Sequence, residues 1–238
     1  MPKTSSRQTN IAKNLMQIQH NISQYCEKYH RNPQDVHLLA VSKTKPTEDI
    51  RTAFKAGQVS FGENYLQESI DKINDLADLP IEWHFIGAIQ SNKTREIAEN
   101  FAWVHSVDRL KIAKRLSQQR ADSLPPLNIC LQINISHESS KSGFNIDDTE
   151  AAVNEIIKLP NLKLRGLMAI PAKADNFLEQ RAIFSQMKTL LTKLQTQHTQ
   201  LDTLSMGMSG DMEAAIAEGS TLLRIGTAIF GERNVAGL

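Results

Sequence analysis

The feature that most constrains the fold is a regular alternation of short apolar runs with longer amphipathic segments. Short apolar runs bounded by turn residues are typical of buried parallel strands, and the amphipathic segments between them are typical of helices. Strict alternation requires parallel strands joined by helical crossovers. Eight such units in 238 residues predict a single (β/α)8 TIM barrel. The predicted strands are 38–42, 59–62, 82–87, 103–107, 127–135, 164–170, 204–208 and 222–230.

An extra N-terminal helix is predicted ahead of the first strand, over residues 9–29. Its apolar residues recur every three or four positions, which places them on one face. Residues 1–8 are polar and expected to be disordered, and the whole chain, 1–238, is predicted to be one domain. An open doubly wound sheet is the alternative fold. Such sheets normally carry a glycine-rich first turn, whereas the turn over 42–45 has no glycine.

Composition excludes several classes of function. The formal net charge is +1, so no strong field favours nucleic acid or a membrane surface. Apolar residues make up 40% of the chain, but none of their runs is long enough to span a bilayer. Cys26 and Cys130 are far apart and form no metal-type pair. These features predict a cytoplasmic protein with two structural thiols and no metal site.

Lys43 occupies the position where the first predicted strand ends. A lysine at the end of a buried strand is poorly hydrated, which lowers the pKa of the amine and makes it nucleophilic. Such an amine forms a Schiff base with an aldehyde. The alternative is a lysine that extends to the surface and has no chemical role.

The loops after the seventh and eighth strands are where barrels of this type often bind phosphate. Ser209 is expected to cap a helix there, leaving free backbone amides beyond it. Gly226 lets the backbone approach a ligand closely, and Thr227 offers a hydroxyl and an amide. The alternative is that Ser209 only caps its helix and Gly226 only marks a bend.

A phosphorylated aldehyde would satisfy both the lysine and the phosphate loops, and pyridoxal 5'-phosphate (PLP) is the common cofactor of that kind. Arg224 is then expected to face the ring. Because arginine does not readily give up its proton, the pyridine nitrogen beside it would stay unprotonated. The alternative for Arg224 is an ion pair within the barrel, for example with Glu213.

Seven motifs in order resemble the pyridoxal phosphate homeostasis protein family (the YggS/PROSC type) over residues 11–233. They are Val41-Ser42-Lys43-Thr44-Lys45-Pro46, Phe61-Gly62-Glu63-Asn64-Tyr65, Trp83-His84-Phe85-Ile86-Gly87, Gln90-Ser91-Asn92-Lys93, Gly166-Leu167-Met168-Ala169-Ile170-Pro171, Gly207-Met208-Ser209 and Arg224-Ile225-Gly226-Thr227-Ala228-Ile229-Phe230-Gly231.

The resemblance implies a barrel like the N-terminal domain of alanine racemase, with PLP on Lys43. It implies phosphate contacts from Ser209, Gly226 and Thr227. It also implies that the ring is contacted by a further set of residues, namely Asn64, Met168 and Arg224.

The expected function is non-catalytic: holding PLP as a Schiff base on Lys43 and buffering or delivering it. Because the sequence ends soon after the predicted eighth strand, we expect it to lack the β-rich second domain of racemases. Tyr65 is the nearest candidate for a second acid or base but is expected to pack in the rim, and His84 is expected to be a satisfied core residue. A racemase-like PLP enzyme and a cofactor-free Schiff-base aldolase are the alternatives.

PLP is the expected ligand, with transient contact to PLP enzymes that lack their cofactor, and the protein is expected to be a monomer. Lys45, Lys93 and Lys141 are candidates for holding the cofactor transiently near the barrel mouth during transfer.

Overall fold

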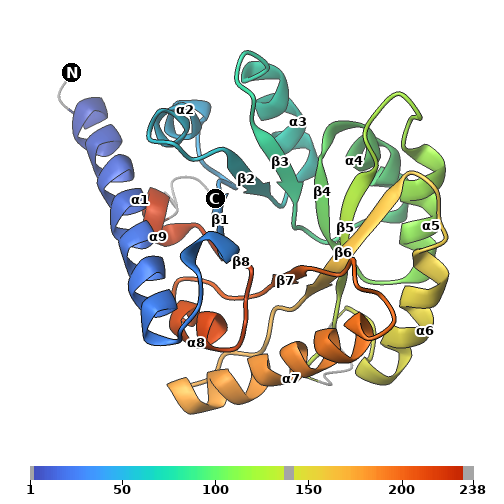
Figure 1. Cartoon of the computed structure of the whole chain (residues 1–238). Coiled ribbons are helices and arrows are strands. Elements are labelled where there is room, and N and C mark those ends of the chain that lie inside the picture. Colours follow the sequence, from blue (N-terminus) through green and yellow to red (C-terminus); the bar gives the residue numbers. More distant parts are fainter. Residues whose placement is uncertain (1–2, 137–141, 233–238) are drawn as a thin grey trace.

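Eight parallel strands form a closed barrel in the order β1-β2-β3-β4-β5-β6-β7-β8, with helices around the outside (Figure 1). The structure is a computed structural model and describes residues 3–136 and 142–232. The first and last strands pair directly, so that Leu39 lies opposite Arg224 and Ala40 opposite Ile225. This pairing confirms the predicted (β/α)8 barrel and rules out the open sheet.

The elements follow the predicted alternation. The strands are β1 (His37–Val41), β2 (Ser60–Glu63), β3 (Glu82–Phe85), β4 (Trp103–Val107), β5 (Leu127–Gln132), β6 (Leu162–Met168), β7 (Thr203–Ser205) and β8 (Leu222–Ile225). The helices are α1 (Lys3–Lys28), η1 (Pro33–Asp35), α2 (Thr47–Lys55), α3 (Leu66–Asp75), η2 (Ser91–Lys93), α4 (Thr94–Asn100), α5 (Leu110–Gln119), α6 (Ile146–Ile156), α7 (Phe177–Gln195), α8 (Met212–Ala217) and α9 (Thr227–Phe230).

Helix α1 packs along the outside of the barrel against α2, α8 and α9, beside the junction of β1 and β8 (Figure 1). Its buried face is the predicted one, and Cys26 continues that face by one more turn. The helix begins at Lys3, so residues 3–8, which were expected to be disordered, are part of it. In the part of the chain that the structure describes, no helix is both long and apolar enough to cross a bilayer.

The eighth strand is much shorter than predicted. It ends at Ile225, and residues 227–230 form the helical turn α9 instead of continuing the strand. The Gly226 carbonyl starts this turn by accepting the amides of Ile229 and Phe230 at 2.9 and 3.0 Å. An apolar run cannot by itself distinguish a strand from a buried helical turn, which is why the sequence pattern missed this change.

The helix caps also differ from the predicted ones. Ser209 caps no helix: α8 begins at Met212, and Asp211 is its N-cap residue. The Asp211 carboxylate accepts the amide of Met208 at 2.5 Å, so it closes the turn in which Ser209 lies. Asp211 makes no side-chain capping hydrogen bond to α8, because its carboxylate accepts the amide of Met208, which precedes the helix.

Candidate functional site

Lys43 lies in a strained turn directly after β1, at the carboxyl end of the barrel. The Ser42 amide extends the pairing with β2 by donating to the Gly62 carbonyl at 3.0 Å, and the Lys45 amide closes the turn on Ser42 at 3.0 Å. Thr44 has a φ of 62°, which is unfavourable for a β-branched residue. Backbone strain of this kind persists only where surrounding contacts enforce it, and it is concentrated at functional sites.

A buried network of charged side chains holds this turn. Glu63, fully buried at the end of β2, accepts the Ser42 hydroxyl at 2.7 Å and the Lys72 ammonium at 2.8 Å. Lys72 also donates to the Ser42 carbonyl at 2.8 Å and to Glu68 at 2.5 Å. Glu68 in turn accepts the strained Thr44 amide at 2.6 Å. The residues on both sides of Lys43 are therefore fixed from α3.

The pKa of Glu63 is raised because the carboxyl is buried, and the Lys72 charge opposes that shift. The network was not expected from sequence, because a lysine on an amphipathic helix normally faces water. The buried residues of α3 are Ser69 and Lys72 rather than apolar residues.

The other lysines proposed to hold the cofactor transiently are engaged or not described. The Lys45 ammonium donates to the carbonyls of Gly231 and Glu232 at 2.9 and 2.8 Å, which ties the loop after β1 to the end of α9. Lys93 pairs with Glu96 on the surface at 3.1 Å. Lys141 lies outside the described residues.

Arg224 projects from β8 into the barrel and is buried. Its guanidinium donates to the Ser205 hydroxyl at 2.7 Å and to the Ala169 carbonyl at 2.9 Å. Burial lowers the pKa of Arg224 to about 10, which leaves it charged at neutral pH. The alternative ion pair with Glu213 is wrong, because Glu213 accepts from Lys28 and Tyr29 at 2.8 and 2.9 Å.

Asn64 directly follows β2 and Met168 ends β6, so the two residues lie on different sides of the barrel. The Oδ1 atom of Asn64 is buried, and none of the described residues donates a hydrogen bond to it. Met168 is fully buried at the end of β6 and packs with Trp103 and Cys130. The Asn64 side chain also lines a cavity at the carboxyl end of the barrel, together with Ser106 and Asp108.

The predicted phosphate residues lie on two loops of the same end. Thr227 is exposed at the start of α9, where helix amides have no acceptor within the helix, and Gly226 precedes it. Ser209 is exposed in the turn after β7. The acidic group of that turn is Asp211, the pKa of which is raised by burial.

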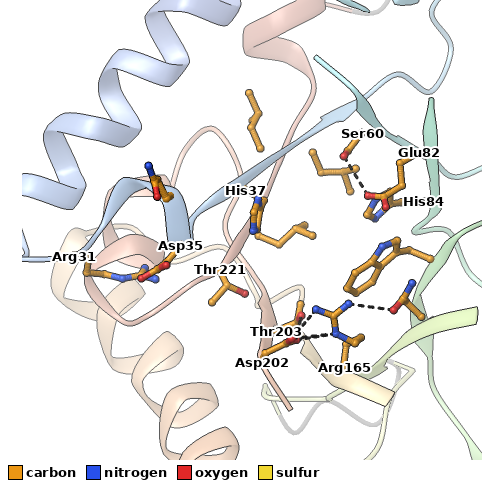
Figure 2. Close-up of a pocket in the computed structure, with 16 residues that line it drawn as sticks. Arg31, Asp35, His37, Ser60, Glu82, His84, Arg165, Asp202, Thr203 and Thr221 are labelled. Atoms are coloured by element: carbon orange, nitrogen blue, oxygen red, sulfur yellow. Dashed lines mark hydrogen bonds and ion pairs between the residues drawn. The ribbon is translucent and has the colours of Figure 1, made fainter. Parts of the chain in front are cut away.

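Two cavities lie at opposite ends of the barrel. One of about 370 Å³ opens at the carboxyl ends of β2 to β6 and is lined by Asn64, Ser106 and Asp108 among others. The other, of about 550 Å³, lies at the amino ends of the strands and is lined by His37, Glu82, His84, Trp103, Arg165 and Asp202 among others (Figure 2).

As expected, His84 is a core residue, and both ring nitrogens have hydrogen-bond partners. Tyr65 is half exposed rather than packed in the rim.

The two cysteines are expected to be inert in the folded protein. Burial raises the pKa of Cys26, and it raises the pKa of Cys130 to about 12, so almost no thiolate exists at pH 8. We expect neither thiol to react with iodoacetamide in the native protein, while both react after unfolding in guanidinium, as measured by intact mass. Rapid labelling of native protein would contradict this assignment.

The fold and the arrangement of the site define a barrel of the alanine racemase N-terminal domain class. The family model described as "Alanine racemase, N-terminal domain" matches residues 14–234. The alanine racemase of Corynebacterium glutamicum has the same fold, with a TM-score of 0.71 at 17% identity, covering 97% of this chain and 63% of that one.

Relatives of much higher sequence identity show to which family within this class the chain belongs. The pyridoxal phosphate homeostasis protein of Pseudomonas aeruginosa is 56% identical over 94% of this chain and 96% of its own. The Escherichia coli K12 protein of that name is 52% identical over 94% of this chain and 97% of its own. PipY of Synechococcus elongatus, solved with PLP bound, has a TM-score of 0.81 at 38% identity, covering 93% of this chain and all of that one. The chain belongs to the pyridoxal phosphate homeostasis protein family.

Proposed function

We propose that this protein binds PLP at the carboxyl end of its barrel, with Lys43 forming a Schiff base to the aldehyde, and that it buffers or delivers PLP in the cell. The observation that carries the proposal is the convergence of three groups on the neighbouring strands β8 and β1. These are an amine in a strained turn, an anchored guanidinium, and the amides that begin α9. The PLP bound to the homologous PipY supports this proposal.

The residues present fit PLP. The unsatisfied oxygen of Asn64 is an acceptor suited to the ring hydroxyl, and Met168 offers an apolar contact. Arg224 would donate to the pyridine nitrogen. Gly226, Thr227 and the exposed hydroxyl of Ser209 would contact the phosphate from the loops after β8 and β7.

The arrangement favours a carrier over an enzyme. The chemistry that PLP supplies when bound is an electron sink, which works best with a protonated pyridine nitrogen. A charged Arg224 does not give up its proton to that nitrogen, so the ring stays a weak sink. His84 is committed to other side chains through both ring nitrogens. These features disfavour the racemase alternative, and we propose that the protein is not an enzyme.

We further propose that the protein works in the cytoplasm as a monomer and contacts PLP enzymes transiently when it delivers the cofactor. The names of the relatives, which refer to PLP homeostasis, support a role in supply rather than in turnover.

The first test replaces Lys43 by alanine. We expect wild type incubated with PLP to turn yellow, and borohydride to fix the ligand covalently to it. The Lys43→Ala variant should lack both properties, because it has no amine at this position. Lys93→Ala, which removes a surface lysine paired with Glu96, is the matched control and should behave as wild type. Visible absorption and intact mass provide the readouts.

A wild type that stays colourless with added PLP would refute the binding proposal and leave the aldolase alternative. The carrier assignment has its own test, which is exchange of the α-hydrogen of amino acids in deuterated water. Exchange that depends on Lys43 would show an enzyme, and we expect none across a broad amino-acid panel.

A further inference from the structure

A continuous chain of hydrogen bonds crosses the interior of the barrel and ends on Arg224. The Arg224 guanidinium donates to the Ser205 hydroxyl at 2.7 Å, and Ser205 lies 2.8 Å from Nδ1 of His105. Nε2 of His105 lies 2.9 Å from Nδ1 of His84, whose Nε2 lies 2.9 Å from the Glu82 carboxylate. Strands β8, β7, β4 and β3 each contribute to it. Barrel interiors are normally filled by branched apolar side chains, so this polar chain is unusual.

Along this chain of hydrogen bonds only one assignment of donors and acceptors is consistent with a carboxylate at Glu82. A carboxylate only accepts, so Glu82 requires a hydrogen on Nε2 of His84, which leaves Nδ1 of His84 as an acceptor. That acceptor requires a hydrogen on Nε2 of His105, and Nδ1 of His105 then accepts the Ser205 hydroxyl. The oxygen of Ser205 in turn accepts from Arg224. Every link is satisfied when both histidines are neutral.

Burial supports this protonation state. His105 and Ser205 are fully buried, and His84 is 2% exposed. Desolvation lowers the pKa of His84 and places the pKa of His105 well below its usual value. The hydrogen bond from His84 holds the pKa of Glu82 below its usual range, so the far end of the chain is a carboxylate.

The carboxylate end reaches the large cavity at the amino ends of the strands. In Figure 2, Glu82 and His84 lie next to each other in the lining, apart from the pair of Arg165 and Asp202. The side chain of Glu82 is 47% exposed. The chain of hydrogen bonds therefore runs from the partly exposed carboxylate of Glu82 at one end of the barrel to the buried guanidinium of Arg224 near the other end.

We infer that Ser205 and His105 are positioning residues for Arg224, and that His84 and Glu82 extend this support to the cavity at the amino end. The inference rests on the proposed function, in which Arg224 faces the pyridine nitrogen of PLP. The Ser205 hydroxyl and the Ala169 carbonyl each accept a hydrogen bond from a different terminal nitrogen of the guanidinium. This fixes the plane of the guanidinium before the ligand arrives, and preorganisation of this kind raises affinity.

The main test compares Ser205→Ala with Ser220→Ala. Both serines are fully buried and hydrogen-bonded, but Ser220 donates only to backbone carbonyls and is not part of the chain of hydrogen bonds that ends on Arg224. The probe is PLP labelled with ¹⁵N in the pyridine ring, and the readouts are its dissociation constant and ¹⁵N chemical shift. Loss of one hydrogen bond to a charged group predicts about 10-fold weaker binding by Ser205→Ala and a changed ¹⁵N shift. Ser220→Ala should lower thermal stability but keep both ligand values.

A second pair tests the far end without altering the buried core. Glu82→Gln removes the terminal charge, and Asp202→Asn removes a carboxylate from the same cavity that is paired with Arg165 instead. We expect Glu82→Gln to shift the ¹⁵N resonance in the same direction as Ser205→Ala, by less, and Asp202→Asn to leave it unchanged.

The positioning role of Ser205 would be overturned if Ser205→Ala kept the wild-type PLP affinity and ¹⁵N shift. It would also be overturned if Ser220→Ala changed both values as much as Ser205→Ala does. An unchanged ¹⁵N shift in Glu82→Gln would overturn the link to the cavity. Failure of wild type to bind PLP would instead refute the proposed function, so the two failures are distinguishable.

Discussion

Replacing Lys72 by methionine is expected to destabilise the protein by about 3–5 kcal/mol, because removal of one partner leaves a buried, uncompensated charge. The side chain of Lys72 is 7% exposed and that of Glu63 is fully buried, so water cannot replace the lost ammonium. The same change removes the hydrogen bond to the Ser42 carbonyl beside Lys43. We therefore expect weaker PLP binding as well as a lower free energy of unfolding, measured by denaturant titration and by absorption of the loaded protein.

Lys93→Met is the matched control for this change. Lys93 also pairs with a glutamate, at 3.1 Å, but the two side chains are 44% and 40% exposed. Exposed pairs of this kind contribute about 0–1 kcal/mol. Equal losses of stability in the two variants would show that the Lys72 network does not hold the turn.

The second large effect is expected for Gly87→Ala. A Cβ atom at position 87 would overlap the backbone carbonyl of Asn64, and backbone cannot move aside as a flexible side chain can. Overpacking typically costs about 1–3 kcal/mol. Because Asn64 would be displaced at the barrel mouth, we expect PLP affinity to fall more than general stability does. Equilibrium dialysis with PLP and thermal unfolding measure the two effects separately.

Gly210→Ala provides the control. Gly210 is exposed in the turn beside Ser209, and apart from its two chain neighbours no heavy atom of the described residues lies within 4 Å of the Cβ that would be added. We expect this variant to match wild type in both stability and PLP affinity. A normal PLP affinity in Gly87→Ala would mean that the position of Asn64 is not critical to the site.

The barrel could be predicted from sequence because each buried parallel strand is a short apolar run, and eight such runs separated by helices leave few arrangements. The ends of the elements could not be predicted equally well. The helix expected directly after Ser209 begins only at Met212, and after Ile225 the apolar run continues into a helical turn. In both cases the local sequence pattern fits more than one backbone conformation.

The parts of the site that escaped prediction depend on long-range contacts between polar residues. Ser205 supports Arg224 from a neighbouring strand, and His105 reaches Ser205 across 100 positions of sequence. Trp103 and His105 lie two positions apart in one strand and therefore share a face. Nothing local to the sequence showed that this face lines the interior of the barrel next to Ser205.

The link from Lys45 to the carbonyls of residues 230–232 has a consequence for folding. It bridges the seam where the first strand meets the last, and contacts this distant in sequence are slow to form. Lys43 lies on one side of the seam and Arg224 and Gly226 on the other, so an unclosed barrel has only half of the proposed binding site. Ligand binding then favours the closed barrel over every state in which the seam is open, by mass action. For this protein, closure of the barrel and assembly of the proposed PLP site therefore occur together.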